Sequence, residues 1–306
     1  MIRRKLLPLG LLAFFALSVV ASASQRVLYE KQSPYNTIVV TEDDRGLRTL
    51  WFEKGGARQS VVKVGDPDHL ELPYARAMPV GLALVEKPER VLIVGLGGGT
   101  IPGFLHAHYP ETTIDVVDID PDVVDVAKRF FGFREDATMH VYVEDGRRFI
   151  EECSRPYDII FLDAFGSENI PYHLATREFL QAVRRALTPK GIAVGNIWSR
   201  SSNPLYDSMV RTYQDVFDEL YILDVRGAGN KILLALPRPE PVEQDDLARR
   251  ATGISHQKHF PFDLGDPVTY GYRHAEKKDS RGHVLTDEKR QQGTGHRGQE
   301  SLNPDH

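Results

Sequence analysis

The stretch VLIVGLGGGTIPG, residues 91–103, decides the fold of this chain. Its first four residues are apolar, and four glycines then fall within five positions, at Gly95, Gly97, Gly98 and Gly99. A short apolar run bounded by glycine is typical of a buried strand. Glycine lets the backbone approach a ligand closely, and the helix expected next presents free N–H groups. The stretch therefore predicts a ligand-binding turn at the end of a strand.

From residue 89 onward, short apolar runs alternate with segments of helical spacing. The runs rich in Val, Ile and Leu lie at 90–97, 113–120, 139–145, 157–165, 191–198, 220–225 and 231–237. Between them, apolar residues recur at helical intervals over 120–131, 146–153, 176–187 and 203–217. This alternation indicates an α/β domain with a parallel sheet covered on both faces. The short link at 226–230 predicts an antiparallel hairpin of the last two strands at the sheet edge.

We place this α/β domain at residues 83–240, with a different segment on each side. Residues 25–82 predict a small β-rich domain, because the runs at 26–31, 36–43 and 48–54 are separated by short polar turns. A helix is expected over 72–85. Residues 241–306 form a C-terminal extension, and its polar composition predicts that it is largely disordered from about residue 274.

Residues 1–23 have the pattern of a signal peptide. Three basic residues at 3–5 precede an apolar run over 6–20 and the small residues Ala21, Ser22 and Ala23. The run is shorter than a membrane-spanning helix requires. We predict cleavage after Ala23 and export to the periplasm or the exterior. The alternative is a membrane anchor formed by residues 6–20, and no other transmembrane segment is expected.

The charge composition argues against a nucleic-acid partner. The chain has 38 basic and 43 acidic residues in 306, a formal net charge of −5. Nucleic-acid-binding domains carry a basic excess that this chain lacks. Small-molecule chemistry is therefore the better expectation.

The glycine-rich turn does not fit two common nucleotide motifs. The dinucleotide fingerprint needs a third glycine, which packs the helix against the strand. In the two possible registers that position holds Thr100 or Pro102. The phosphate-binding loop needs Gly-Lys-Ser/Thr, which does not follow here. A nucleoside without a pyrophosphate is the better candidate ligand.

Three successive strands after the turn end in an aspartate, at Asp118, Asp145 and Asp163. Ligands bind at the carboxyl ends of such strands, so these side chains should surround the ligand. Asp118, about twenty residues past the glycines, fits ribose hydroxyls. Asp145 fits either the adenine amino group or a helix cap. An idle carboxylate is costly to bury, so Asp163 is expected to bind ligand or transfer a proton. Asp120 precedes Pro121 and is expected to cap a helix.

These motifs resemble, in order and spacing, the nucleoside-binding motifs of the aminopropyltransferase family, the spermidine synthases. The matching segments are residues 97–99 (GGG), 117–121 (VDIDP), 144–146 (EDG) and 157–163 (YDIIFLD), within a likeness that runs from about Val27 to Pro237. Residues 170–180 and 284–288 (VLTDE) are similar to a bacterial branch often fused to transporter segments. The resemblance implies a methyltransferase-type, Rossmann-like fold with a mostly parallel seven-stranded sheet and a small N-terminal β domain.

The resemblance also implies a reaction. In the family, an amine attacks the carbon next to the sulfonium of decarboxylated S-adenosylmethionine, and an acidic residue takes the amine proton. No metal is implied. For the nucleoside, the resemblance implies the four glycines, Asp118 for ribose, and Asp145 with Gly146 for adenine. For the amine, it implies Gln59 and Tyr74.

The sequence departs from the family on the acceptor side. The family's proton acceptor is the second aspartate of an Asp-x-x-Asp-Pro motif. Here that motif begins at Asp163 and the second position is Gly166, so Asp163 and Glu168 are the catalytic candidates. Arg76 stands where the family has a glutamate, and a cation there would oppose a dicationic amine.

Three functions therefore stay open on the sequence. The first is aminopropyl transfer to a small amine. The second is methyl transfer from S-adenosylmethionine, because the same sheet and acidic strand ends serve that chemistry. The third is a non-catalytic nucleoside-binding protein that has lost its base. The resemblance also makes a homodimer an expectation.

Overall fold

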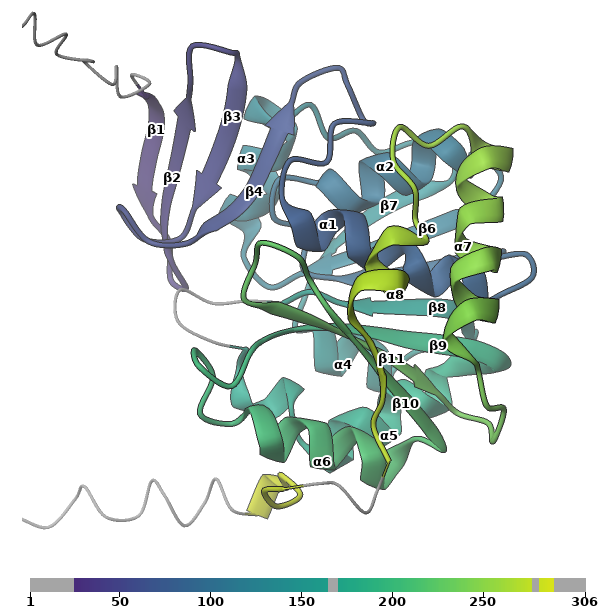
Figure 1. Cartoon of the computed structure of the whole chain (residues 1–306). Helices are drawn as coiled ribbons and strands as arrows, with labels where there is room; N and C mark the ends of the chain where they lie inside the picture. Colours follow the sequence, from purple (N-terminus) through teal and green to yellow (C-terminus); the bar gives the residue numbers. More distant parts are fainter. Residues whose placement is uncertain (1–24, 165–169, 277–280, 289–306) are drawn as a thin grey trace, which may run out of the picture.

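The N-terminal domain is a four-stranded antiparallel sheet in the order β1-β2-β3-β4 (Figure 1). The computed structural model describes residues 25–164, 170–276 and 281–288. The strands are β1 (Arg26–Gln32), β2 (Thr37–Glu42), β3 (Leu47–Trp51) and β4 (Arg58–Lys63). The first three match the predicted runs. The fourth, RQSVVK, was not predicted, because its polar residues interrupt the apolar pattern of a strand, although Ser60 and Val61 are both buried.

The second sheet has eight strands in the order β12-β10-β11-β9-β8-β5-β6-β7. All seven predicted strands are present, as β5 (Arg90–Val94), β6 (Thr113–Asp118), β7 (Met139–Val143), β8 (Tyr157–Leu162), β9 (Leu187–Trp198), β10 (Glu219–Asp224) and β11 (Asn230–Leu236). The predicted antiparallel hairpin of β10 and β11 is confirmed. It does not form the sheet edge, however, because β12 (Tyr272–His274) pairs antiparallel with β10. Three residues are too few to show a strand period in the sequence.

The pairing of the central strands places the predicted site residues together. Strand β5 pairs parallel with β6 and β8, β6 pairs parallel with β7, and β8 pairs parallel with β9. Their carboxyl ends therefore meet at one edge of the sheet. Gly95 follows β5, Asp118 ends β6, Asp145 follows β7 and Asp163 follows β8.

Helices cover both faces of this sheet (Figure 1). One core contains side chains from α1 (Pro73–Ala77), η1 (Met78–Leu84), α2 (Thr100–His108), α7 (Gln244–Lys258) and α8 (Asp266–Gly271). The other contains side chains from α4 (Gly146–Glu151), α5 (Arg177–Ala186) and α6 (Tyr206–Val216). Helix α3 (Pro121–Phe130) packs Val124 and Ala127 into the first core and Val123 and Val126 against the N-terminal sheet. It thereby joins the two sheets.

The prediction of a single helix over residues 72–85 is wrong. The segment forms the short helix α1 followed by the 3-10 helix η1. Pro79 has no N–H to donate to a continuing helix. At Gly81, a Cβ atom would lie 2.5 Å from Val194 Cγ2, so this segment packs directly on β9. Close packing of the backbone on the sheet replaces the regular helix.

The C-terminal extension contributes α7, α8 and β12 to the large domain. Residues 281–288 lie against α5 and α6, with Leu285 1% exposed. Some predicted features fall outside the described residues. They are the signal peptide at 1–23, Glu168 and the part of the C-terminal extension after residue 288. In the ranges that the structure covers, none of the helices has the length and hydropathy needed to cross a membrane.

Candidate active site

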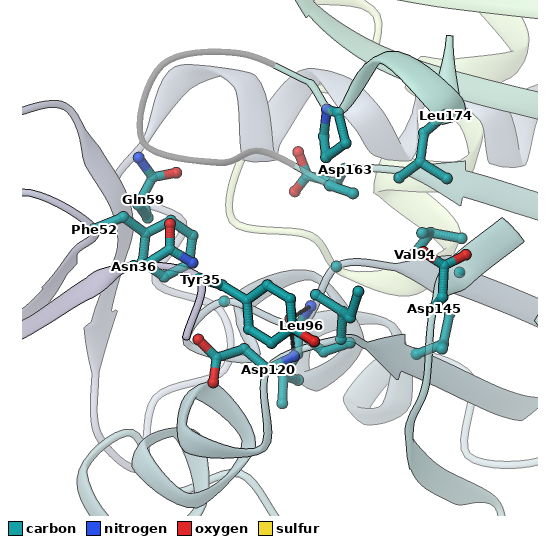
Figure 2. A pocket seen from close by; sticks show the side chains of 18 of the residues that line it. Tyr35, Asn36, Phe52, Gln59, Val94, Leu96, Asp120, Asp145, Asp163 and Leu174 are labelled. Atoms are coloured by element: carbon teal, nitrogen blue, oxygen red, sulfur yellow. Dashed lines mark hydrogen bonds between the residues drawn. The ribbon is translucent and has the colours of Figure 1, made fainter. Parts of the chain in front are cut away.

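A cavity of about 220 Å³ lies at the carboxyl edge of the large sheet, beneath the N-terminal sheet. In Figure 2, Asn36 and Gln59 from the N-terminal domain lie on one side and Asp145 on the other, with Asp163 above them. Asp118, Tyr74 and Gly146 also line this cavity. The structure thus brings most of the predicted nucleoside residues and both predicted amine residues to one place.

Gly95 shapes the floor of the cavity. Its φ angle is +101°, a value that residues with a side chain rarely adopt. A Cβ atom here would lie 2.4 Å from the backbone oxygen of Asp163. Glycine therefore allows the turn after β5 and the end of β8 to touch.

Ser60 on β4 holds the glycine turn from above. Its buried hydroxyl accepts a 2.8 Å hydrogen bond from the Gly98 N–H. A Cβ at Gly97 would lie 2.6 Å from the same oxygen. Of the four predicted glycines, Gly95 and Gly97 line the site cavity, whereas Gly98 and Gly99 line a separate cavity with Phe131 and Phe133. Gly98 and Gly99 therefore shape the turn and do not face the ligand space.

The Asp118 carboxylate is engaged by the turn that it faces. Its Oδ2 atom accepts from the Leu96 N–H at 2.9 Å, and Oδ1 accepts from the Asp120 N–H at 3.0 Å. Burial raises the pKa of Asp118 to about 6, against the lowering effect of these donors. Each carboxylate oxygen can accept a further bond, so Asp118 can still bind two hydroxyls.

Asp120 has the structural role expected of it. It caps α3, accepting from the Asp122 N–H at 3.0 Å, and it accepts a 2.5 Å bond from the Ser33 hydroxyl. The residue is 1% exposed. Its carboxylate therefore links the N-terminal sheet to the large domain.

Asp145 has the predicted role of a helix cap, and it also lines the cavity. Its Oδ1 atom caps α4 by accepting from the Arg147 and Arg148 N–H groups at 2.9 and 3.1 Å. Its Oδ2 atom lies 2.8 Å from His173 Nε2. Burial favours the neutral acid, but the Arg148 N–H and His173 outweigh it and lower the pKa of Asp145. Asp145 thus caps α4 and lines the cavity at the same time.

Asp163 lines the cavity together with the predicted amine residues Gln59 and Tyr74. Its Oδ1 atom accepts a 2.8 Å bond from the Asn196 amide. Burial raises the pKa of Asp163 to about 7. Burial and, second, the charge of Asp163 raise the pKa of Tyr74 well above its usual value. The Tyr74 hydroxyl donates to the backbone carbonyl of Gln59 at 3.0 Å. This bond holds the two predicted amine residues next to each other.

The expected effect of Arg76 on the amine is wrong. Arg76 is exposed and does not line the site cavity; it lies in a different cavity with Arg226 and Asp263. Its Nε donates to the Leu70 carbonyl. Two positions along α1 from Tyr74, the side chain points to another face of the helix.

Sequence reasoning missed several residues of the site. Ser60 comes from β4, Tyr35 and Asn36 from the turn between β1 and β2, and Asn196 from near the carboxyl end of β9. His173 lies in the segment 170–180, whose family likeness could have singled it out. Nothing local in the sequence singles out the other four. Among the described residues, no group of three or more His, Cys, Asp or Glu side chains is placed to hold a metal ion.

The fold and the strand-end carboxylates together define a class of protein, the transferases built on the methyltransferase-type Rossmann-like fold. Residues 74–218 match the model of the spermine/spermidine synthase domain. The chain is also 38% identical over 235 residues to a polyamine aminopropyltransferase of Vibrio vulnificus (strain CMCP6), covering 74% of this chain and 78% of that protein. The chain belongs to the spermidine synthase family and is a transferase of that family.

Two solved structures bear on the cavity. Human methyltransferase-like protein 13 in complex with SAH shares 32% identity at a TM-score of 0.57, over 62% of this chain and 94% of that chain. A spermidine synthase in complex with the transition-state analogue AdoDATO shares the fold, with a TM-score of 0.60 and 22% identity over 78% of this chain and 80% of that chain. The second structure shows that the fold is shared.

Proposed function

We propose that this protein transfers an aminopropyl group from decarboxylated S-adenosylmethionine to a small amine, with Asp163 as the proton acceptor. The observation that carries the proposal is the position of the Asp163 carboxylate, which lines the cavity together with both the nucleoside residues and Tyr74. Family membership supports the reaction type.

The nucleoside occupies the part of the cavity around Asp118 and Asp145. Asp118 accepts hydrogen bonds from the two ribose hydroxyls. Asp145, fixed by its bonds to α4 and His173, accepts one from the adenine amino group. Gly95 and Gly97 line the part of the cavity that takes the sulfonium end of the ligand.

The amine approaches from the side of Gln59 and Tyr74. A second cavity of about 220 Å³ shares these two residues and also touches Asn196 and Trp198. It thus adjoins the site next to the amide that binds Asp163. An acceptor threaded through it would present its nitrogen beside the Asp163 carboxylate.

The chemistry requires one proton transfer. The uncharged amine nitrogen attacks the methylene carbon next to sulfur, a C–N bond forms, the C–S bond breaks, and methylthioadenosine leaves with the sulfur electron pair. The Asp163 carboxylate accepts the proton that the nitrogen loses. A carboxyl group with a pKa near 7 is well matched to this role at neutral pH. Gly166 occupies the family's usual position for the base, and Asp163 compensates for it.

Methyl transfer is the second candidate, and the likeness to methyltransferase-like protein 13 favours it. The two activities release different products. Aminopropyl transfer leaves methylthioadenosine, whereas methyl transfer leaves S-adenosylhomocysteine. The nucleoside product therefore identifies the reaction.

The test uses the purified chain without residues 1–23, a mixture of amines and either sulfonium donor. Methylthioadenosine above a no-enzyme control, formed from the decarboxylated donor, supports the proposal. S-adenosylhomocysteine alone supports methyl transfer. Ligand binding without either product supports the non-catalytic reading.

Two variants assign the base. Asp163→Asn is expected to lower transfer by about 100-fold or more, the usual contribution of a general base. Glu168→Gln is the matched control, and we expect little change. The reverse pattern would assign the proton to Glu168. Export and a homodimer stay predictions, to be checked by cell fractionation and by mass in solution.

A further inference from the structure

Residues 284–288, which we name the C-terminal clip, are bound to the large domain at several points. The Leu285 N–H donates to the Thr212 hydroxyl on α6 at 2.9 Å, and its carbonyl accepts from the Arg177 N–H at the start of α5 at 2.8 Å. The Leu285 side chain is 1% exposed. In Figure 1 the segment lies beside α6, far along the chain from the strands that form the site.

The clip holds Arg147, which lies two residues after Asp145. The Asp287 carboxylate accepts two hydrogen bonds from the Arg147 guanidinium, at 2.9 and 2.7 Å. This bidentate geometry is the strong form of an arginine–carboxylate pair. The Arg147 guanidinium is the first cause of the lowered pKa of Asp287. Arg147 also reaches the His173 carbonyl at 3.4 Å, so one guanidinium connects the clip to the loop of the site.

A second contact reaches the same loop. The Tyr172 hydroxyl donates to the Thr286 carbonyl at 3.1 Å. Tyr172 and His173 belong to the short 3-10 helix η2 (Tyr172–Leu174). His173 in turn binds the free oxygen of Asp145 at 2.8 Å. The clip therefore contacts Arg147, two residues after Asp145, and Tyr172, next to His173.

We propose that Asp287 is a positioning residue for nucleoside binding, acting through Arg147 and η2 on Asp145 and His173. The inference rests on the proposed nucleoside site, and it adds the C-terminal clip to the parts that build it. Two hydrogen-bonded routes from the clip converge on the hydrogen-bonded pair of Asp145 and His173, and both residues line the cavity. Loss of the clip contact leaves the Asp145–His173 wall held only from one side.

The experiment measures the dissociation constants of methylthioadenosine and S-adenosylhomocysteine by calorimetry, together with KM and kcat for any transfer found. Asp287→Asn is the test. Asp218→Asn is the matched control, because Asp218 pairs with Arg184 at 2.8 Å and does not line the cavity. We expect Asp287→Asn to weaken binding about three- to tenfold and to raise the nucleoside KM alike, with kcat within twofold. Couplings between contacting residues are commonly of this size.

Two further variants separate positioning from general destabilisation. Asp287→Glu keeps the carboxylate and should recover at least half of the lost affinity. Arg147→Ala and Asp287→Asn should not add in the double variant, because they act on one route. If Asp287→Asn binds both probes as the wild type does, or if Asp218→Asn weakens binding equally, the clip has no positioning role. If the folded wild type binds neither probe, the nucleoside site itself is wrong and both proposals fall.

Discussion

Replacing Asp163 with asparagine should stabilise the protein while it abolishes transfer. Burial raises the pKa of Asp163 from near 4 to about 7. A shift of about 3 units corresponds to about 4 kcal/mol, the upper limit of what the folded protein loses by ionising this group. Because the side chain keeps some exposure, we expect about 2 kcal/mol. Asparagine has the same shape, and its oxygen can still accept from Asn196.

The raised pKa of Asp163 determines whether the stability of the wild type rises or falls with pH. The folded-state pKa is the higher one, so the folded state holds the proton more tightly than the unfolded chain. Below about pH 4 both states are protonated and ionisation costs nothing. As pH rises to about 7, the wild type progressively loses stability, and above pH 7 the loss is complete. The asparagine variant has no such loss. Its advantage should therefore be small at pH 5 and full at pH 8.

Urea denaturation of both proteins at pH 5 and pH 8 measures the stability advantage of the variant. Groups that titrate alike in the two proteins do not contribute to this difference. We expect the free energy of unfolding of the variant to exceed that of the wild type by about 2 kcal/mol at pH 8 and by less than about 1 kcal/mol at pH 5. An advantage of the same size at both pH values, or a less stable variant at pH 8, would refute the assignment of a buried carboxylate with a raised pKa. Transfer by the wild type should rise with pH through about 7, as the base ionises.

Three other substitutions test the geometry. Gly95→Ala should destabilise the protein by more than about 2 kcal/mol in thermal unfolding, because its Cβ would meet the Asp163 carbonyl. Gly55→Ala is the control: Gly55 has a φ of +76° and open space around it, so this substitution should cost about 1 kcal/mol. Ser60→Ala leaves the buried Gly98 N–H without its partner, so it should cost about 1–3 kcal/mol and weaken nucleoside binding in calorimetry; unchanged affinity and stability would show that the bond is dispensable. Arg76→Ala should leave the amine KM within about twofold, since its side chain lies outside the site; a drop of fivefold or more would place Arg76 in the acceptor path after all.

The strands, the glycine turn and the acidic strand ends could be read from the sequence. A run such as 91–94 is buried because of its own apolar side chains, and Asp118, Asp145 and Asp163 each follow such a run. Parallel pairing then brings the strand ends to one edge. The Asp120 cap could be predicted for the same reason, because a cap depends on the residues next to it. These features are local, and local spacing reports them.

The rest of the site depends on contacts between distant residues. Ser60 reaches the glycine turn from 38 residues away, Asn196 reaches Asp163 from 33, and Asp287 reaches Arg147 from 140. Whether Arg76 faces the amine depends on how α1 is rotated on the sheet, which no spacing in its own segment reveals. The sequence by itself determined the seven strands from β5 to β11 and the residues that end them. Only the tertiary structure decided which side chains meet around the cavity, because packing of the two domains and the C-terminal clip sets those distances.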